Sequence, residues 1–72
     1  AGMILLPLGS ERGVALGNVY TLWKANKKAA RIRIQSVSQG FSLAYLLPQF
    51  GTPQELRPGD SVHVVPEIEE TL

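Results

Sequence analysis

Five of the seven basic residues of this chain stand between positions 24 and 33, directly after its one tryptophan. The cluster consists of Lys24, Lys27, Lys28, Arg31 and Arg33, and Trp23 precedes it. Lysine and arginine neutralise phosphate groups, and an aromatic ring can stack on a nucleic-acid base. One interpretation is therefore a surface for nucleic acid or another anionic partner. The other is the solvated face of a β-hairpin, whose lysines discourage edge-to-edge aggregation and whose tryptophan fills the interior.

Net charge does not decide between these interpretations. The formal charge is +1 at pH 7, so long-range attraction to a polyanion is weak. The charge is unevenly placed, because Glu67, Glu69 and Glu70 gather at the C-terminal end. Three interpretations of the basic cluster stay open: a solvated strand face, a docking surface for a protein or an anionic glycan, and a surface for nucleic acid.

The sequence has few residues that could support catalysis. His63 is the single histidine and stands within an apolar run, and cysteine is absent, which excludes disulfides and thiolate metal sites. No serine has a neighbouring base that the sequence can assign, and a nucleophilic serine requires one. We predict no enzyme activity, no metal site and no cofactor.

Glycines recur at every fourth position at Gly9, Gly13 and Gly17. A phosphate-binding loop would also need a Lys-Ser or Lys-Thr ending and a following helix, and the sequence has neither. We therefore predict tight turns at positive φ. The stretch RPGD at 57–60 predicts a β-turn with Gly59 at positive φ and Asp60 hydrogen-bonded to the turn backbone.

The elements that position these residues are predicted to be short strands, because turn-forming residues interrupt the chain at short intervals. No window has the apolar spacing of a long helix. We expect strands over residues 3–8, 18–24, 29–38, 41–47 and 61–67, and a short 3₁₀ turn within 53–57. The clearest alternation is in 29–38, where Ile32 and Ile34 should face the core while Arg31 and Arg33 face water.

Aromatic residues supply part of the predicted core and one more candidate contact. Phe41 and Tyr45 share one strand face, which we expect to be packed, while Ser42 and Ala44 on the other face are closely approached. Phe50 stands in a loop, where it either anchors the loop on the domain or lies exposed for a partner.

Together these elements predict an all-β fold, a small SH3-like partly open barrel of about five antiparallel strands. Residues 18–47 should form a three-stranded meander. Because proline donates no ladder hydrogen bond, the first strand should either lie at a sheet edge or end near Pro7. Residues 1–66 then form a single small domain, and 67–72 an acidic C-terminal tail. No run approaches the ~18 apolar residues of a membrane-spanning helix, so we predict no membrane span.

The stretch ILLPLGSERGVALGNVYTLWK, followed later by SLAYLL and LRPGDSVHV, resembles a pattern in small β-domains of bacterial cell-envelope proteins. It is most similar to the C-terminal β-barrel domain of the flagellar assembly protein T family. Similar phrases occur in β-domains of rod-shape-determining proteins and of proteins with peptidoglycan-binding LysM modules. The resemblance implies a non-catalytic module of the periplasm or cell envelope that docks onto a larger assembly. The basic hairpin and the LLPQFGTP loop fall outside the pattern.

We therefore predict a non-catalytic protein-interaction or assembly module of a bacterial envelope, secretion or flagellum-associated protein. It would bind another protein, or a second copy of itself, through an edge strand or through the basic hairpin. The candidate partner-binding residues are Trp23, Lys24, Lys27, Lys28, Arg31, Arg33 and Phe50. The alternative is a nucleic-acid-binding barrel that uses the basic hairpin at 24–33.

Overall fold

The computed structural model describes residues 2–48 and 50–67, and within these ranges the chain is built from strands and 3₁₀ turns. The strands are β1 (Met3–Leu6), β2 (Val19–Lys24), β3 (Lys27–Val37), β4 (Ser42–Leu46) and β5 (His63–Pro66). The 3₁₀ turns are η1 (Ser10–Arg12), which was not predicted, and η2 (Pro53–Glu55), which was. The predicted all-β fold is confirmed. Helical structure in this part of the chain is confined to short turns, none with the length or apolar character for a membrane crossing.

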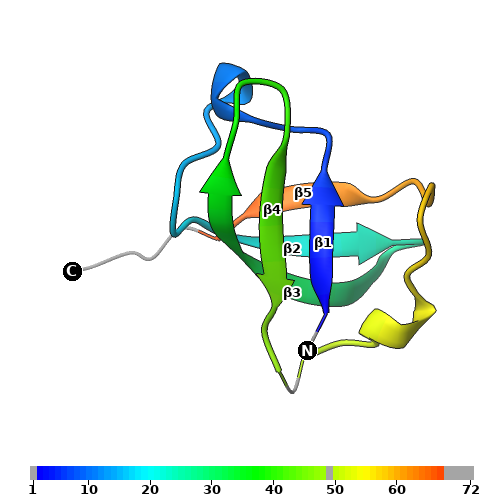
Figure 1. Ribbon diagram of the computed structural model, residues 1–72. Helices are drawn as coiled ribbons and strands as arrows, with labels where there is room; N and C mark the ends of the chain where they lie inside the picture. The colour runs from blue at the N-terminus through cyan, green and yellow to red at the C-terminus, as the bar shows by residue number, and fades with distance from the viewer. Residues whose placement is uncertain (1, 49, 68–72) are drawn as a thin grey trace.

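In the described ranges the strands form one antiparallel sheet in the order β1-β4-β3-β2-β5. The predicted meander of β2, β3 and β4 is confirmed, β1 returns beside β4, and β5 pairs with β2. Figure 1 shows β1 and β4 crossing in front of β2 and β5. Because β1 and β5 are the two edges, the sheet does not close, and the domain is a small, partly open barrel.

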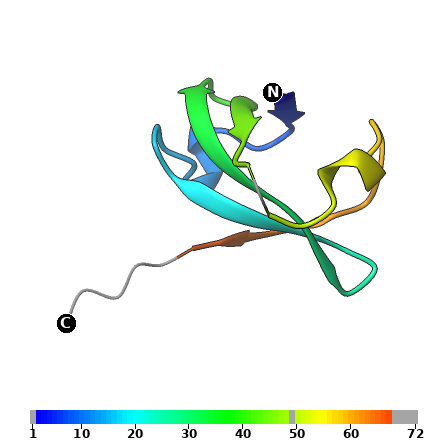
Figure 2. The ribbon, with the colours of Figure 1, turned by 90° about the horizontal axis from the view of Figure 1, so that it is seen from below.

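The long strand β3 belongs to both crossing layers. Its first part pairs with β2, from Lys24 opposite Lys27 to Val19 opposite Arg33, and its later part pairs with β4. The register with β4 shifts after Ile34, and such a bulge bends a strand and increases its twist. Figure 2 shows β3 curving from the hairpin with β2 toward β4.

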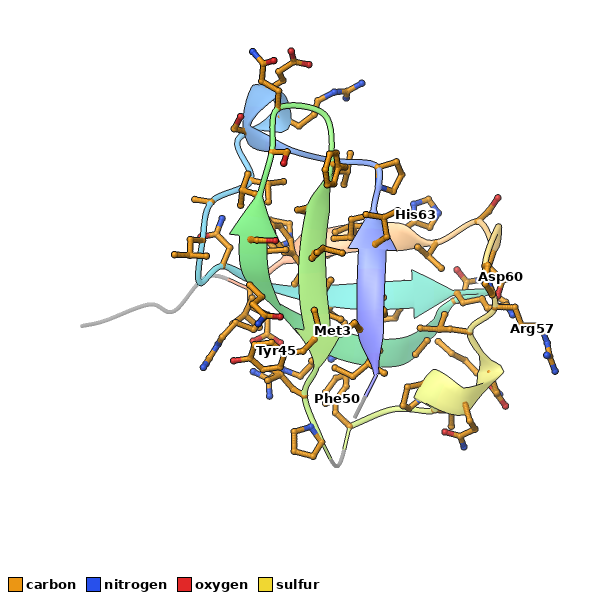
Figure 3. The ribbon with its side chains drawn as sticks, viewed as in Figure 1. Met3, Tyr45, Phe50, Arg57, Asp60 and His63 are labelled. Carbon is orange, nitrogen blue, oxygen red and sulfur yellow. The ribbon has the colours of Figure 1, made fainter. Side chains whose placement is uncertain are left out.

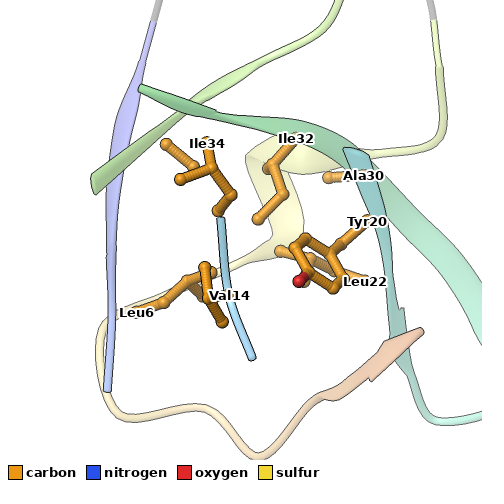
Figure 4. Packing of buried hydrophobic residues seen from close by; sticks show 8 residues of the cluster. Leu6, Val14, Tyr20, Leu22, Ala30, Ile32 and Ile34 are labelled. Carbon is orange, nitrogen blue, oxygen red and sulfur yellow. The ribbon is translucent and has the colours of Figure 1, made fainter. Parts of the chain in front are cut away.

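The core lies between these layers. Ile32 and Ile34 are buried, Arg33 is exposed and Arg31 is half-buried, so the predicted alternation of β3 is confirmed. The other buried members of the core cluster, most of them shown in Figure 4, are Leu6, Val14, Tyr20, Leu22, Ala30 and Ala44. Every strand except β5 contributes a buried residue to this cluster, and β5 packs against it with Val64, which is half-buried.

The prediction that Phe41 and Tyr45 form the packed face of the fourth strand is wrong. Ser42 and Ala44 are buried, whereas Phe41 is 46% exposed and Tyr45 is half-buried on the opposite face. The large side chains at this part of the core come from neighbouring strands, for example Ile4 of β1, which lies opposite Ala44. Small residues on β4 leave room for them, so here the smaller side chains mark the inner face.

Ser42 carries a hydroxyl group that is buried and has no hydrogen-bond partner in the structure. It lies opposite Leu6 of β1 and Val37 of β3, both apolar. A buried polar group without a partner costs about 1–3 kcal/mol, so we expect Ser42→Ala to raise the free energy of unfolding by about 1 kcal/mol in urea denaturation. The exposed Ser36→Ala control should change it by less than about 0.5 kcal/mol. A destabilised Ser42→Ala variant would contradict the prediction.

Positive φ angles occur where the chain turns tightly. Ala25 and Asn26 join β2 to β3 at φ of 51° and 65°, which is typical of a type I′ turn between twisted strands. Gly13 and Gly17 have φ of 80° and 85°, as predicted. Gly9 differs from the prediction, because its φ is −133° and glycine is required there by a close approach to the β3–β4 loop.

Candidate functional site

Lys24 ends β2 and holds the loop that precedes β5. Its Nζ donates hydrogen bonds to Asp60 Oδ2 at 2.8 Å and to the carbonyl oxygen of Glu55 at 2.9 Å. Asp60 Oδ2 also accepts the Arg57 N–H at 2.8 Å, in the predicted turn where Gly59 has φ of 88°. These hydrogen bonds, that of Lys24 foremost, lower the pKa of Asp60. The ammonium group of Lys24 is therefore committed to contacts within the chain.

Arg31 on β3 is committed in a similar way. Its Nε and Nη2 donate to Oε1 and Oε2 of Glu67, both at 2.7 Å, and Thr21 Oγ1 donates to the same Oε1 at 3.0 Å. The hydrogen bonds from Arg31 lower the pKa of Glu67, and they raise the pKa of Arg31. The Arg31 guanidinium also lies 5.4 Å from the ring centre of Phe50. Phe50 is half-buried, and this contact favours its role as an anchor of the loop.

The remaining candidates lie on the β2–β3 hairpin. Lys28 Nζ is 5.5 Å from the ring centre of Trp23, its register partner, and Trp23 is half-buried. Lys27 and Arg33 are exposed and form no ion pair within residues 2–48 and 50–67. The structure therefore brings the predicted residues to one hairpin and the loops beside it. It uses Lys24, Lys28 and Arg31 in contacts within the chain, which leaves them less available to phosphate groups.

The Arg31–Glu67 ion pair predicts a measurable sensitivity to acid. Because folding lowers the pKa of Glu67 below its unfolded value of about 4.3, the pair stabilises the fold above that pH. This contribution is lost as the pH falls through the lowered pKa. We expect the free energy of unfolding to decrease below about pH 4, and Glu67→Gln to flatten part of this decrease in urea denaturation at stepped pH.

The exposed Glu11→Gln is the matched control for the loss of one carboxylate, because Glu11 forms no ion pair within the described residues. An unchanged pH dependence in Glu67→Gln would show that the ion pair contributes nothing to stability. Asp60→Asn should likewise flatten part of the decrease in the free energy of unfolding at low pH, because the pKa of Asp60 is also lowered in the folded chain.

A second candidate binding surface is the side of β1 that faces away from β4. The Leu46 N–H donates to the Gly2 carbonyl at 3.1 Å, and bonded and non-bonded pairs alternate along antiparallel strands. Ile4 is therefore also bonded to β4, whereas Met3 and Leu5 direct their N–H and C=O groups away from it. No strand of the described chain pairs with this side.

An apolar groove of about 720 Å³ lies beside this free edge, and we call it the β1 groove. β1 lines one side, residues of the segment 53–62 line the other, and Leu22 of β2 and Leu46 of β4 complete the lining. Arg57 and Asp60 are the charged residues of the lining, and the Asp60 carboxylate is already paired with Lys24. Figure 3 shows the Arg57 side chain extending away from the domain. The interior of the groove is therefore apolar.

The outer face of β1 is apolar as well. Met3 is 53% exposed, Leu5 is 64% exposed, and Phe41 stands nearby before β4; we call these three residues the outer apolar patch. Leu5 and Phe41 line a shallow depression of about 360 Å³ together with Pro7 and Gly40. Met3 lies opposite Tyr45, and Figure 3 shows these two side chains together. The edge strand thus has apolar surface on both of its faces.

The two sheet edges differ in their protection. β5 ends at Pro66, which has no N–H to donate, and the charged Glu67 follows it. β1 contains no charged residue, nor do the flanking positions Gly2 to Ser10, although Pro7 limits its length. Because charged residues and prolines normally block sheet edges, β1 is the less protected edge of this sheet.

Comparison with models of protein families, with curated proteins and with solved structures finds no match. The sequence predicted that the first strand lies at an edge or ends near Pro7, and β1 is an edge strand that ends at Leu6. It did not predict the β1 groove, because Leu56 and Val62 of the second wall are far from β1 in the chain. The signal that could have revealed the site is the uncharged run MILL next to a proline, at a predicted sheet edge.

Proposed function

We propose that this domain is a non-catalytic, SH3-like protein-interaction module that takes up an extended segment of another protein along the free edge of β1. The observation that carries the proposal is the position of this uncharged, unpaired edge beside the β1 groove. An added strand would exchange hydrogen bonds with the backbone of Met3 and Leu5. Alternate side chains of that strand would enter the groove, because successive strand residues point to opposite faces.

The shape of the groove favours a single extended chain over a second folded copy of this domain. The groove has walls on both sides, β1 and the segment 53–62. An isolated extended segment occupies one strand position between such walls, whereas the edge strand of a folded copy brings its neighbouring strand with it. Self-association through β1 is accordingly the competing outcome of the experiment below.

Leu5→Pro tests the proposal directly. Leu5 directs its N–H away from β4, so proline there removes a donor of the free edge without removing a bond of the sheet. The probe is a display library of unstructured peptides, selected for binding to the wild-type chain. We expect selected peptides to shift the amide signals of β1 and of residues 56–62, and Leu5→Pro to weaken them by about tenfold or more.

Leu5→Ala is the matched control, since it shortens the same side chain but keeps the N–H; it should weaken binding less than Leu5→Pro. Equal binding by wild type and Leu5→Pro, or peptide shifts away from β1, would contradict the proposal. Sedimentation of the chain alone should give a monomer. If the wild-type chain is instead a dimer that Leu5→Pro dissociates, the partner at β1 is a second copy of this chain and not another protein.

The basic hairpin is tested separately with a fluorescent oligonucleotide. Lys27→Glu combined with Arg33→Glu is the informative variant, because both residues are exposed, whereas Arg31→Glu would break the ion pair with Glu67. We expect no binding at micromolar protein. If the oligonucleotide binds, if this binding weakens steeply with salt, and if the double variant loses it, the partner is a nucleic acid and not a protein.

The envelope location implied by the resemblance belongs to this proposal. A module of this kind would hold an extended segment of a neighbouring subunit in a bacterial envelope or flagellar assembly. Fractionation of the native protein supports this location if the chain is found in the periplasm or with the envelope. Recovery in the cytoplasm contradicts the location but leaves the docking edge as proposed.

A further inference from the structure

The β1 groove and the outer apolar patch meet at the same strand. In a segment added to β1, alternate side chains would point into the groove, and those between them would lie beside the outer patch. On the basis of the proposed function, we infer that this edge selects a continuous run of about four apolar residues in extended conformation. A strand that alternates apolar and polar residues would satisfy only one of the two surfaces.

The groove determines the inward positions of the segment. Its lining includes Leu46, Leu56 and Val62, each half-buried and each packed partly against the core. A polar side chain placed among them would lose water without gaining a hydrogen bond, which is unfavourable. The inward residues of the segment are therefore apolar.

The outer patch determines the positions in between. Met3 and Leu5 are each more than half exposed, and the depression between Leu5 and Phe41 lies on the same outer face of the sheet. An outward apolar side chain on the added strand would cover these residues and gain burial, whereas a polar one would leave them in water. This requirement distinguishes the edge from that of an ordinary sheet, whose outer face is polar.

Charge is excluded from the centre of the run. β1 and its flanking residues Gly2 to Ser10 carry no charged side chain, so a lysine or glutamate paired there would find no opposite charge. Arg57 and Asp60 belong to the opposite wall, and Asp60 is occupied by Lys24. Charged residues of the partner can therefore flank the apolar run but not interrupt it.

Three synthetic peptides of equal length test the inference. The first has a central run of valine, flanked by lysine and glutamate for solubility. In the second and third, threonine replaces valine at one or the other set of alternate positions, which keeps side-chain shape and strand propensity nearly constant. We expect each alternating peptide to bind the wild-type chain about tenfold more weakly than the continuous one, by amide chemical-shift titration.

Phe41→Ser separates the two faces, because Phe41 is exposed, stands outside β4 and belongs to the outer patch. Phe41→Ser should weaken the binding of the continuous valine peptide. It should leave unchanged the affinity of whichever alternating peptide binds more tightly. Equal affinity of the three peptides, or equal weakening of all by Phe41→Ser, would overturn the inference while leaving the proposed function intact. Binding that Leu5→Pro does not reduce would overturn the proposed function itself.

Discussion

Gly9→Ala is expected to destabilise the domain by about 3 kcal/mol, from overpacking and lost hydrogen bonds together. A Cβ atom at Gly9 would lie 2.2 Å from the carbonyl oxygen of Ser38 and 2.4 Å from that of Gln39. The same two oxygens accept hydrogen bonds from the N–H groups of Ser10 at 2.9 Å and Glu11 at 3.2 Å. Because both obstacles are backbone atoms, the β1–η1 and β3–β4 loops must separate, and these hydrogen bonds lengthen or break.

Gly40→Ala is the matched control for this experiment. Gly40 lies in the same β3–β4 loop, a Cβ there would meet no atom within 4 Å, and its φ is not positive. Alanine reduces the freedom of the unfolded chain, so the control should be unchanged or up to about 1 kcal/mol more stable in urea denaturation. A Gly9→Ala variant within about 0.5 kcal/mol of the wild type would contradict the predicted clash.

Ile32→Ala is expected to lower the free energy of unfolding by about 2–5 kcal/mol. Ile32 is completely buried at the centre of β3, paired with Tyr20 of β2 and Leu46 of β4. Both partner strands are fixed by the hydrogen bonds of β3, so the surroundings cannot collapse into the cavity. A chain of 72 residues has a total stability of roughly 4–11 kcal/mol, so this single change removes a large share of it.

Leu16→Ala is the control for the loss of side-chain volume, because Leu16 is 71% exposed. It should change the free energy of unfolding by less than about 0.5 kcal/mol. Thermal unfolding followed by near-ultraviolet circular dichroism compares the two variants. Similar melting temperatures for Ile32→Ala and Leu16→Ala would show that the inward face of β3 does not support the core.

The local sequence pattern predicts which face of a strand is buried when that strand carries both large apolar and charged residues. In β3, Ile32 and Arg33 alternate on opposite faces, and the hydrophobic effect alone decides which face is buried. In β4 both faces carry apolar residues, so the pattern is ambiguous. The inner face is then decided by the volume of neighbouring side chains, such as Ile4 opposite Ala44, and the register that brings them together is a tertiary property.

The candidate site was predictable to a smaller extent. The sequence identified the basic hairpin, but the carboxylates that engage Lys24 and Arg31 are Asp60 and Glu67, more than thirty positions further along the chain. No local rule pairs such distant residues, and the same is true of the two walls of the β1 groove. Gly9 was predicted to turn the chain at positive φ, but glycine is needed there because of contact with another loop.

The pairing of β1 with β4 also has a consequence for the order of folding. β2 and β3 are joined through Ala25 and Asn26 alone, so their hairpin closes a minimal loop, whereas Met3 must find Tyr45 across most of the chain. Closing the longer loop costs more entropy and requires β4 to be in place, so β1 is secured late. During synthesis β1 is made before β4, so the strand that is proposed to bind a partner stays unpaired until its own partner strand has formed.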